Sequence, residues 1–181
     1  MTLEDIQEYV KDKNVILVGN SENVKHYDKS KLIDDHDVVV RMNHAIPGGN
    51  LGDKTDIWLC SYNKKSDQTL KFSIFNADVN IRLNDDDNLH ESLIDKFYIW
   101  PDAERDKIRK IIKSKYPSTG VMAIYFFTEY CQSKSLTIVY MDGFITKTFY
   151  NKYAIAEKYH NVMSEREYIS RMINESKIGL C

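Results

Sequence analysis

Val15-Ile16-Leu17-Val18 is a short apolar run that breaks at once into the polar Gly19-Asn20, and it decides how this chain folds. Two similar runs follow, Val38-Val39-Val40-Arg41 and Ile57-Trp58-Leu59-Cys60, each ending in polar residues. Continuous apolar runs of this length are typical of strands buried on both faces of a parallel sheet. Open α/β sheets bind ligands beyond the carboxyl ends of their strands. The three runs, at 15–19, 38–41 and 57–60, therefore predict the binding edge of an α/β domain.

The rest of the chain alternates short apolar runs with longer amphipathic segments. Further strands are expected over residues 72–75, 79–83, 98–100 and 136–141. Helices are expected over residues 3–12, 103–115, 121–131, 150–158 and 164–176, with a short helix or a loop over 22–31. This alternation is typical of an α/β domain with a largely parallel sheet. We predict one Rossmann-like domain spanning residues 1–181, with helices flanking the sheet.

Some helices carry features that can be checked one by one. Thr2 is a suitable N-cap for the first helix, with Asp5 three residues later. The helix over 103–115 is expected to turn three isoleucines towards the core, Ile108, Ile111 and Ile112. The helix over 121–131 is apolar on nearly every side, and helices of that kind are buried.

Composition narrows the class of protein. The chain has 181 residues, of which 43% are hydrophobic and 29% charged, as in soluble globular proteins. A net charge of -2 does not indicate a nucleic-acid or anionic-membrane partner. No apolar run approaches the ~20 residues that span a bilayer, and the acidic N-terminus is not a signal peptide. Three cysteines are too few for a disulfide scaffold, which favours a reducing, cytoplasmic setting.

The first candidate site is Gly19-Asn20-Ser21-x-Asn23, directly after the first strand. It is either a loop that binds a nucleotide or phosphate, with amide side chains reading a base or ribose, or an ordinary polar turn. The glycine fingerprint of dinucleotide-binding proteins is absent.

The second candidate site is Pro117-Ser118-Thr119-Gly120, which precedes the buried helix. Ser118 or Thr119 can cap that helix. The same geometry binds anions, because the first N–H groups and the positive end of the helix dipole point outwards. Gly120 would let a ligand approach the backbone. An ordinary helix cap remains the alternative.

The third candidate is His160, with Glu165 five positions later. A histidine can act as a general base near neutral pH, and a carboxylate can orient it. A surface or helix-capping histidine is the alternative. Asp85-Asp86-Asp87 contains a metal-binding spacing, but a solvated loop explains it as well. The other histidines form no zinc cluster, and we expect neither a metal nor a cofactor.

Together these stretches resemble the eukaryotic-type sialyltransferases, glycosyltransferase family 29. Residues 15–59 resemble the long motif of that family, above all in Ile33–Asn43 and Leu51–Thr55. Residues 117–143 resemble its short motif, and His160-x4-Glu165 resembles its very short motif. The three motifs occur in the order of the family and cover roughly half of the chain.

The resemblance implies a GT-A-like sialyltransferase fold and a metal-independent, inverting transfer of sialic acid from CMP-sialic acid to an acceptor hydroxyl, on a glycan or another molecule. His160 would deprotonate the acceptor, with Glu165 in support. The residues that would bind the donor nucleotide are Gly19, Asn20, Ser21, Asn23, Asn43, Ser118, Thr119, Gly120 and Gly143. A metal-independent transfer is compatible with the candidate sites described above, because fixed hydrogen-bond donors can replace a metal beside a leaving phosphate.

The chain departs from the family pattern at two places. The long motif of the family begins with a cysteine that pairs with the one matching Cys131, and Val15 stands there instead. The third short motif of the family, rich in histidine and tyrosine, would fall near residues 147–153. Its histidine is missing, and Tyr150 or Tyr153 is the candidate replacement.

Two alternatives stay open. The same scaffold could use another nucleotide sugar, such as a UDP-pentose, on a non-glycan acceptor such as a hydroxylated base of viral DNA. It could also be a catalytically silent nucleotide-binding module, which the missing histidine would explain. The acceptor, the linkage and the oligomeric state do not follow from these residues.

Overall fold

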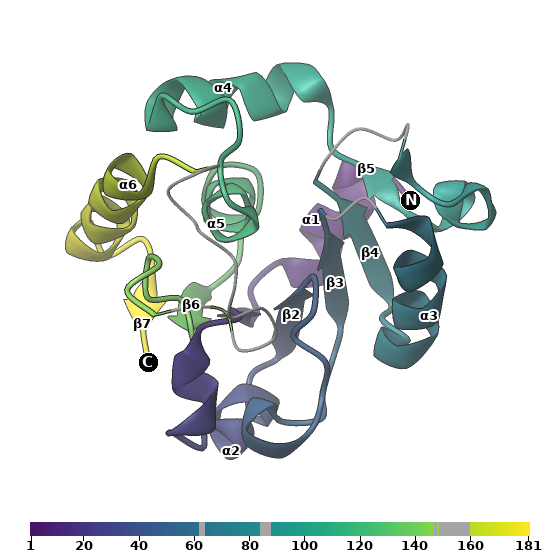
Figure 1. Cartoon of the computed structure of the whole chain (residues 1–181), viewed down its shortest axis with the longest axis horizontal. Helices are drawn as coiled ribbons and strands as arrows, with labels where there is room; N and C mark the ends of the chain where they lie inside the picture. The colour runs from purple at the N-terminus through teal and green to yellow at the C-terminus, as the bar shows by residue number, and fades with distance from the viewer. Residues whose placement is uncertain (62–63, 84–87, 147, 149–159) are drawn as a thin grey trace.

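A seven-stranded, fully parallel sheet forms the centre of the computed structural model (Figure 1), which describes residues 1–61, 64–83, 88–146, 148 and 160–181. The strand order is β5-β4-β3-β2-β1-β6-β7. The strands are β1 Asn14–Val18, β2 Val38–Met42, β3 Ile57–Cys60, β4 Val79–Arg82, β5 Tyr98–Ile99, β6 Ser135–Val139 and β7 Gly179–Leu180. The chain therefore builds outwards in one direction from β1 to β5 and then returns to place β6 on the other side of β1. The carboxyl ends of β1 and β6 flank this switch point, where open α/β sheets bind ligands.

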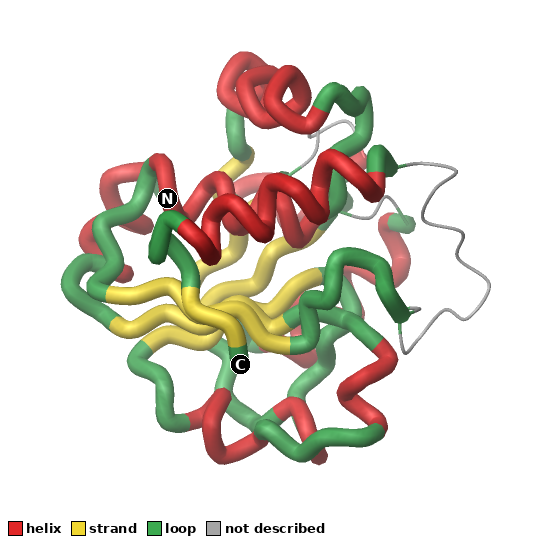
Figure 2. The backbone as a smooth tube through the Cα atoms, turned by 90° about the vertical axis from the view of Figure 1, so that its left-hand side faces the viewer, coloured by secondary structure: helices red, strands yellow, loops and turns green. Residues whose placement is uncertain are grey.

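Helices cover both faces of the sheet (Figure 2). Helices α1 Leu3–Val10, α4 Asp102–Ile112, α5 Thr119–Glu129 and α6 Val162–Asn174 pack on one face. The other face carries α2 Ser30–Asp34, α3 Lys65–Phe75 and the 3₁₀ turns η1 Glu22–Lys25, η2 Gly49–Leu51 and η4 Glu91–Lys96. None of the helices in the described residues is long and apolar enough to cross a bilayer.

Several local predictions are confirmed. The predicted fold class is correct, as is the burial of α5, in which Val121–Phe127 are all buried. At α1, the backbone N–H of Asp5 donates to Thr2 Oγ1 at 3.2 Å and that of Thr2 donates to Asp5 Oδ2 at 2.7 Å. This reciprocal pair is a capping box, which satisfies two N–H groups at the exposed helix start.

Other predictions were wrong. Residues 72–75 are not a strand, because they form the last turn of α3, where Phe75 is buried and Ile74 is 42% exposed. Ile111 also faces solvent at 42% exposure, since only Ile108 and Ile112, four residues apart, share the inner face of α4. The two-residue strand β7 was missed. The predicted helix at 150–158 lies outside the described residues.

Candidate active site

A buried arginine organises the loop behind the site. Arg41 on β2 has no solvent-exposed surface, and burial lowers its pKa to about 10. Its guanidinium donates to the carbonyl oxygens of Leu51, Gly52 and Lys54, each at 2.9 Å, and to Thr55 Oγ1 at 2.8 Å. One side chain thus holds the loop between β2 and β3 from inside.

Asp34 holds the same part of the loop through its backbone N–H groups. Its carboxylate accepts the backbone N–H groups of Asp53 and Lys54, both at 3.0 Å. Gly52 adopts φ +68, and a Cβ there would lie 2.4 Å from Asp34 Oδ1, so this position suits only glycine. The stretches Ile33–Asn43 and Leu51–Thr55 therefore act mainly as a scaffold.

Asn43 joins three elements at the carboxyl edge of the sheet. It has a left-handed backbone with φ +50, directly after β2. Its Nδ2 donates to Thr119 Oγ1 at 2.9 Å, at the start of α5. Its Oδ1 accepts Ser61 N at 2.8 Å and Ser61 Oγ at 3.0 Å, beyond β3. Ser61 also contacts Thr119 through the two hydroxyl groups. Sequence reasoning missed Ser61, because its only signal was a polar residue after a strand.

The turn after β1 packs tightly against β6. A Cβ on Gly19 would lie 2.2 Å from the carbonyl oxygen of Tyr140, so a side chain is excluded there. Asn20 donates its Nδ2 to the carbonyl of Met42 at 3.1 Å. Its Oδ1 is buried and accepts no hydrogen bond from the described residues. Asn20 therefore presents an unmet acceptor beside Asn43.

Ser21 and Asn23 make local contacts instead. Ser21 Oγ accepts the backbone N–H of Asn23 at 3.2 Å, which caps η1. Asn23 Nδ2 lies 3.4 Å from Asp142 Oδ2, beyond the end of β6. Ser21 and Asn23 therefore stabilise the loop after β1 and its contact with the loop after β6. A direct role of either residue in binding remains a prediction.

The start of α5 is the third part of the candidate site, beside Asn43 and the turn after β1. Ser118 Oγ accepts the backbone N–H of Val121 at 3.3 Å, which is the predicted cap. The N–H of Ser118 donates to Glu165 Oε1 at 2.8 Å. A Cβ on Gly120 would lie 2.7 Å from Met141 Cε, the flexible end of a side chain. The helix start is therefore tied both to Asn43 and to α6.

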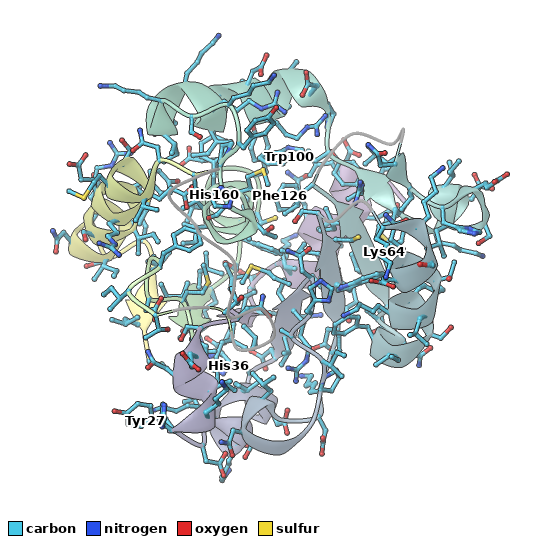
Figure 3. The ribbon with its side chains drawn as sticks, viewed as in Figure 1. Tyr27, His36, Lys64, Trp100, Phe126 and His160 are labelled. Atoms are coloured by element: carbon cyan, nitrogen blue, oxygen red, sulfur yellow. The ribbon has the colours of Figure 1, made fainter. Side chains whose placement is uncertain are left out.

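His160 immediately precedes the cap of α6 and lies between α5 and α6 in the view of Figure 3. Its Nδ1 lies 2.7 Å from the carbonyl oxygen of Tyr116. Because a carbonyl only accepts, Nδ1 carries the proton and Nε2 carries the lone pair. The imidazole stacks on the ring of Phe144, with centroids 5.3 Å apart and planes at 14°. Its side chain is 26% exposed.

Glu165 is almost fully buried beneath His160, at 1% exposure. Its Oε1 lies 4.0 Å from His160 Nδ1, and its Oε2 has no hydrogen-bond partner among the described residues. Burial raises the pKa of this carboxyl, and the hydrogen bonds from Ser118 oppose that rise. The predicted pairing of His160 with Glu165 is therefore present in space, with the carboxylate also clamping the start of α5.

Comparison with known proteins relates part of the chain to a family and the whole chain to a known fold. Residues 7–83 match the model of glycosyltransferase family 29 (sialyltransferase). A crystal structure of a mammalian sialyltransferase aligns with 93% of this chain and 68% of its own, at TM-score 0.67 and 16% identity. Part of the chain therefore resembles glycosyltransferase family 29, and the whole chain shares the fold of sialyltransferases.

Two further structures share the fold. One is a mammalian sialyltransferase in complex with Gal-β-1-3GalNAc-ortho-nitrophenol, at TM-score 0.64 and 15% identity over 93% of this chain and 69% of the other. The second is the sialyltransferase CstII from Campylobacter jejuni with the substrate analogue cytidine-5'-monophosphate, at TM-score 0.61 and 15% identity over 94% and 79%. A search of curated protein sequences finds no match.

The three stretches that resemble family 29 motifs come together through a series of contacts. Asn43, in the stretch that resembles the long motif, bonds Thr119, and Glu165 bonds the neighbouring Ser118. Gly143, at φ +61, closes the short motif, and its carbonyl accepts Arg166 Nε at 2.6 Å. Segments far apart in the chain thus meet at one edge of the sheet.

Of the two departures from the family pattern, the structure describes the cysteine position and does not describe the tyrosines. All three cysteines lie in the described part of the chain and none forms a disulfide. Val15 is fully buried in β1, and burial raises the pKa of the Cys131 thiol to about 12. Tyr150 and Tyr153, like the acidic Asp85–Asp87, lie outside the described residues.

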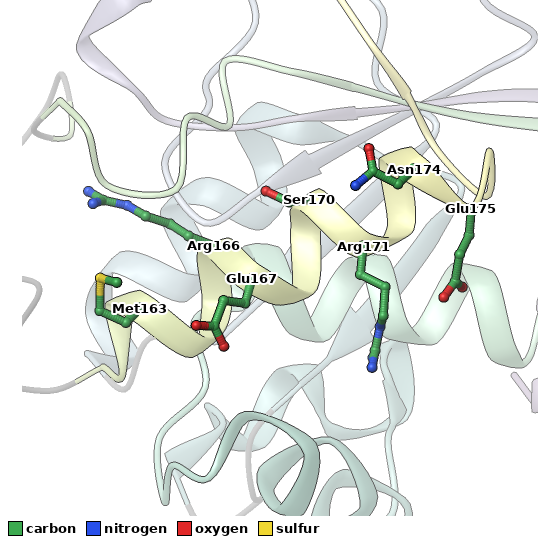
Figure 4. A pocket seen from close by; sticks show the side chains of 7 residues that line it. All are labelled: Met163, Arg166, Glu167, Ser170, Arg171, Asn174 and Glu175. Atoms are coloured by element: carbon green, nitrogen blue, oxygen red, sulfur yellow. The ribbon is translucent and has the colours of Figure 1, made fainter.

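An open hollow lies apart from these contacts, on α6 (Figure 4). It is lined by Met163, Arg166, Glu167, Ser170, Arg171, Asn174 and Glu175. All of these residues come from a single helix and several are charged, so the hollow is a helix surface. Of its lining residues, Arg166 is the one that bonds Gly143, at the edge of the candidate site.

Proposed function

We propose that this chain transfers sialic acid from CMP-sialic acid to an acceptor hydroxyl, with inversion and without a metal, and that His160 is the general base. One observation carries the proposal. The Nδ1–H of His160 is committed to the carbonyl of Tyr116, which leaves the Nε2 lone pair for a substrate proton.

In the proposed step the acceptor oxygen attacks the anomeric carbon as its proton passes to His160 Nε2. The new C–O bond forms on the face opposite the phosphate. The bond from the anomeric carbon to the phosphate oxygen breaks, and CMP leaves with the electron pair. The carboxylate of Glu165, 4.0 Å from Nδ1, would stabilise the imidazolium that forms.

The donor would lie along the edge formed by Asn20, Asn43 and the start of α5. Asn20 Oδ1 is a buried acceptor that suits an amino or hydroxyl group of the nucleoside. Fixed N–H groups and the dipole of α5 would stabilise the leaving phosphate in place of a metal. Support for CMP comes from the Campylobacter relative, which was crystallised with cytidine-5'-monophosphate.

The test is transfer by His160→Ala, with His26→Ala as a matched control because His26 is exposed at the end of η1 and is not among the proposed site residues. Loss of a general base lowers kcat by about 10²–10⁴. We expect that loss only in His160→Ala, with CMP still raising the melting temperature of both variants. Full transfer by His160→Ala would show that the base is misassigned.

A donor panel separates the alternatives. Ligands that bind only the folded state stabilise it by about 2.7 kcal/mol at a hundred times their Kd. We expect strong stabilisation by CMP and CMP-sialic acid. Stabilisation by UDP-sugars instead would favour the UDP-pentose alternative, and binding without any sugar release would favour a silent nucleotide-binding module.

We also propose a reducing, cytoplasmic setting. It is supported by the buried Val15 at the position of the family's disulfide cysteine, and by the free, half-buried Cys131, whose thiol pKa is raised by desolvation. Cell fractionation of the tagged protein tests this, and recovery in a secretory compartment would contradict it.

A further inference from the structure

We propose that Phe144 is a positioning residue for the base, holding the imidazole of His160 in its working orientation through a ring stack that a strained turn delivers. This rests on the proposed role of His160. Phe144 directly follows the stretch that resembles the short motif, and that resemblance gives it no role at the base.

The backbone at Phe144 is unusual for its residue type. Gly143 and Phe144 follow one another at φ +61 and φ +64, both in the left-handed region. Glycine accepts that conformation, but a bulky side chain disfavours it. Asparagine or glycine would relieve the strain at position 144, yet the chain carries phenylalanine. Strain of this kind is typical of functional sites where the surroundings enforce it.

The surroundings of the turn enforce it from two directions. The carbonyl of Gly143 accepts Arg166 Nε at 2.6 Å, and a Cβ at Gly143 would lie 2.9 Å from Arg166 Cγ. The N–H of Ile145 donates to the carbonyl of Asp142 at 3.3 Å. Ile145 itself is 75% exposed, so burial of apolar surface does not explain the shape of the turn.

This turn places the ring of Phe144 nearly parallel to the imidazole of His160. The Phe144 and His160 centroids are 5.3 Å apart, with 14° between the planes. The hydrogen bond from Nδ1 to Tyr116 fixes one atom of the imidazole but still permits rotation about that bond. The stack fixes the plane of the ring. The two contacts together determine where Nε2 points.

The first turn of α6 anchors both sides of this arrangement. Glu165 bonds the N–H of Ser118, and the next residue, Arg166, bonds the carbonyl of Gly143. Asn161 caps the helix through Ser164 N at 3.4 Å. His160, directly before that cap, therefore sits between two turns held by one helix.

The stack also suits the reaction. As His160 takes the acceptor proton it becomes a cation, and an aromatic face attracts a cation. This attraction is stronger in the transition state than in the ground state, so it lowers the barrier. Loss of the ring should therefore reduce kcat and leave the KM for the donor unchanged.

The decisive variant is Phe144→Asn, because asparagine tolerates the left-handed backbone and removes the ring. Phe144→Tyr keeps the ring. Lys113→Asn is the matched control, since Lys113 is an exposed residue with φ 53 at the end of α4. We expect Phe144→Asn to lose about ten-fold to a hundred-fold in kcat, as misplaced catalytic groups do, with an unchanged or higher melting temperature. Phe144→Tyr should be close to wild type, and Lys113→Asn should keep full kcat.

Full kcat in Phe144→Asn, or equal loss in Phe144→Tyr, would overturn the proposal. The imidazole proton resonances of His160 provide a readout independent of activity and of variant folding. A ring stacked on Phe144 shifts them upfield in the wild type, and unshifted resonances would also overturn the proposal. If His160→Ala keeps full transfer, the function of His160 is wrong, and the resonances still decide whether the stack exists.

Discussion

Replacing Arg41 with methionine should destabilise the protein by several kcal/mol. Methionine has a similar length and suits a buried position, but it cannot donate a hydrogen bond. The substitution removes the donor from four carbonyls: those of Leu51, Gly52 and Lys54 at 2.9 Å, and that of Ala45 in a long contact of 3.5 Å. The carbonyl of Gly52 keeps a second donor, the N–H of Gly48 at 2.7 Å.

The loss therefore falls mainly on the carbonyls of Leu51 and Lys54. A buried acceptor without a partner costs about 1–3 kcal/mol, so two cost about 2–6 kcal/mol. Methionine recovers part of this through apolar packing. We expect the free energy of unfolding to fall by about 3–5 kcal/mol, a large share of the ~5–15 kcal/mol typical of a domain.

Urea denaturation measures this change, with the fluorescence of the buried Trp58 and Trp100 as the signal. Figure 3 marks Trp100 in the core. Arg109→Met is the matched control, because Arg109 contacts two aspartates at 2.7 Å at the surface of α4. Surface pairs contribute about 0–1 kcal/mol. If Arg41→Met costs no more than Arg109→Met, Arg41 does not hold the loop and the scaffold role of the long motif is refuted.

Three further predictions concern the site and the thiols. Gly19→Ala should cost about 1–3 kcal/mol in urea, because its Cβ meets a backbone carbonyl at 2.2 Å; Gly120→Ala, which meets a flexible side-chain end, should cost clearly less, and equal costs would contradict this. Burial raises the pKa of Glu165 in the folded state, so its contribution to stability is present at low pH and is lost as pH rises through that raised pKa. Glu165→Gln should therefore flatten the dependence of the melting temperature on pH as pH rises from the ordinary carboxyl range through that raised pKa, and an unchanged slope would refute this. In native labelling with iodoacetamide, the exposed Cys181 should react quickly and the half-buried Cys131, whose pKa is raised to about 12, slowly; comparable rates would contradict the raised pKa of Cys131.

Local signals predicted much of the framework. The run at Ile57–Cys60 became β3 with the expected bounds, because four apolar residues in succession indicate burial on both faces. The caps at Thr2 and Ser118 were predictable, since a cap depends on neighbours in the chain. The prediction of a strand at 72–75 was wrong, because a short apolar run does not distinguish a strand from a turn of helix.

The site could be predicted only in part. His160 and Asn43 were named through motif-like patterns, and their roles in the reaction remain predictions. Ser61 was not found, because a single serine after a strand has no distinguishing pattern. Phe144 was missed as a partner of His160, since nothing local indicates that a phenylalanine will adopt φ +64.

The sequence by itself determined the fold class and pointed to three segments that resemble family motifs, because apolar periodicity, caps and motifs are properties of neighbouring residues. Only the tertiary structure decided that Asn43 bonds Thr119, that Glu165 clamps Ser118 and that Phe144 stacks on His160. These pairs meet because β6 returns beside β1 and α6 packs against the start of α5. That order of strands and that packing arise from burial of the whole core, which no local stretch encodes.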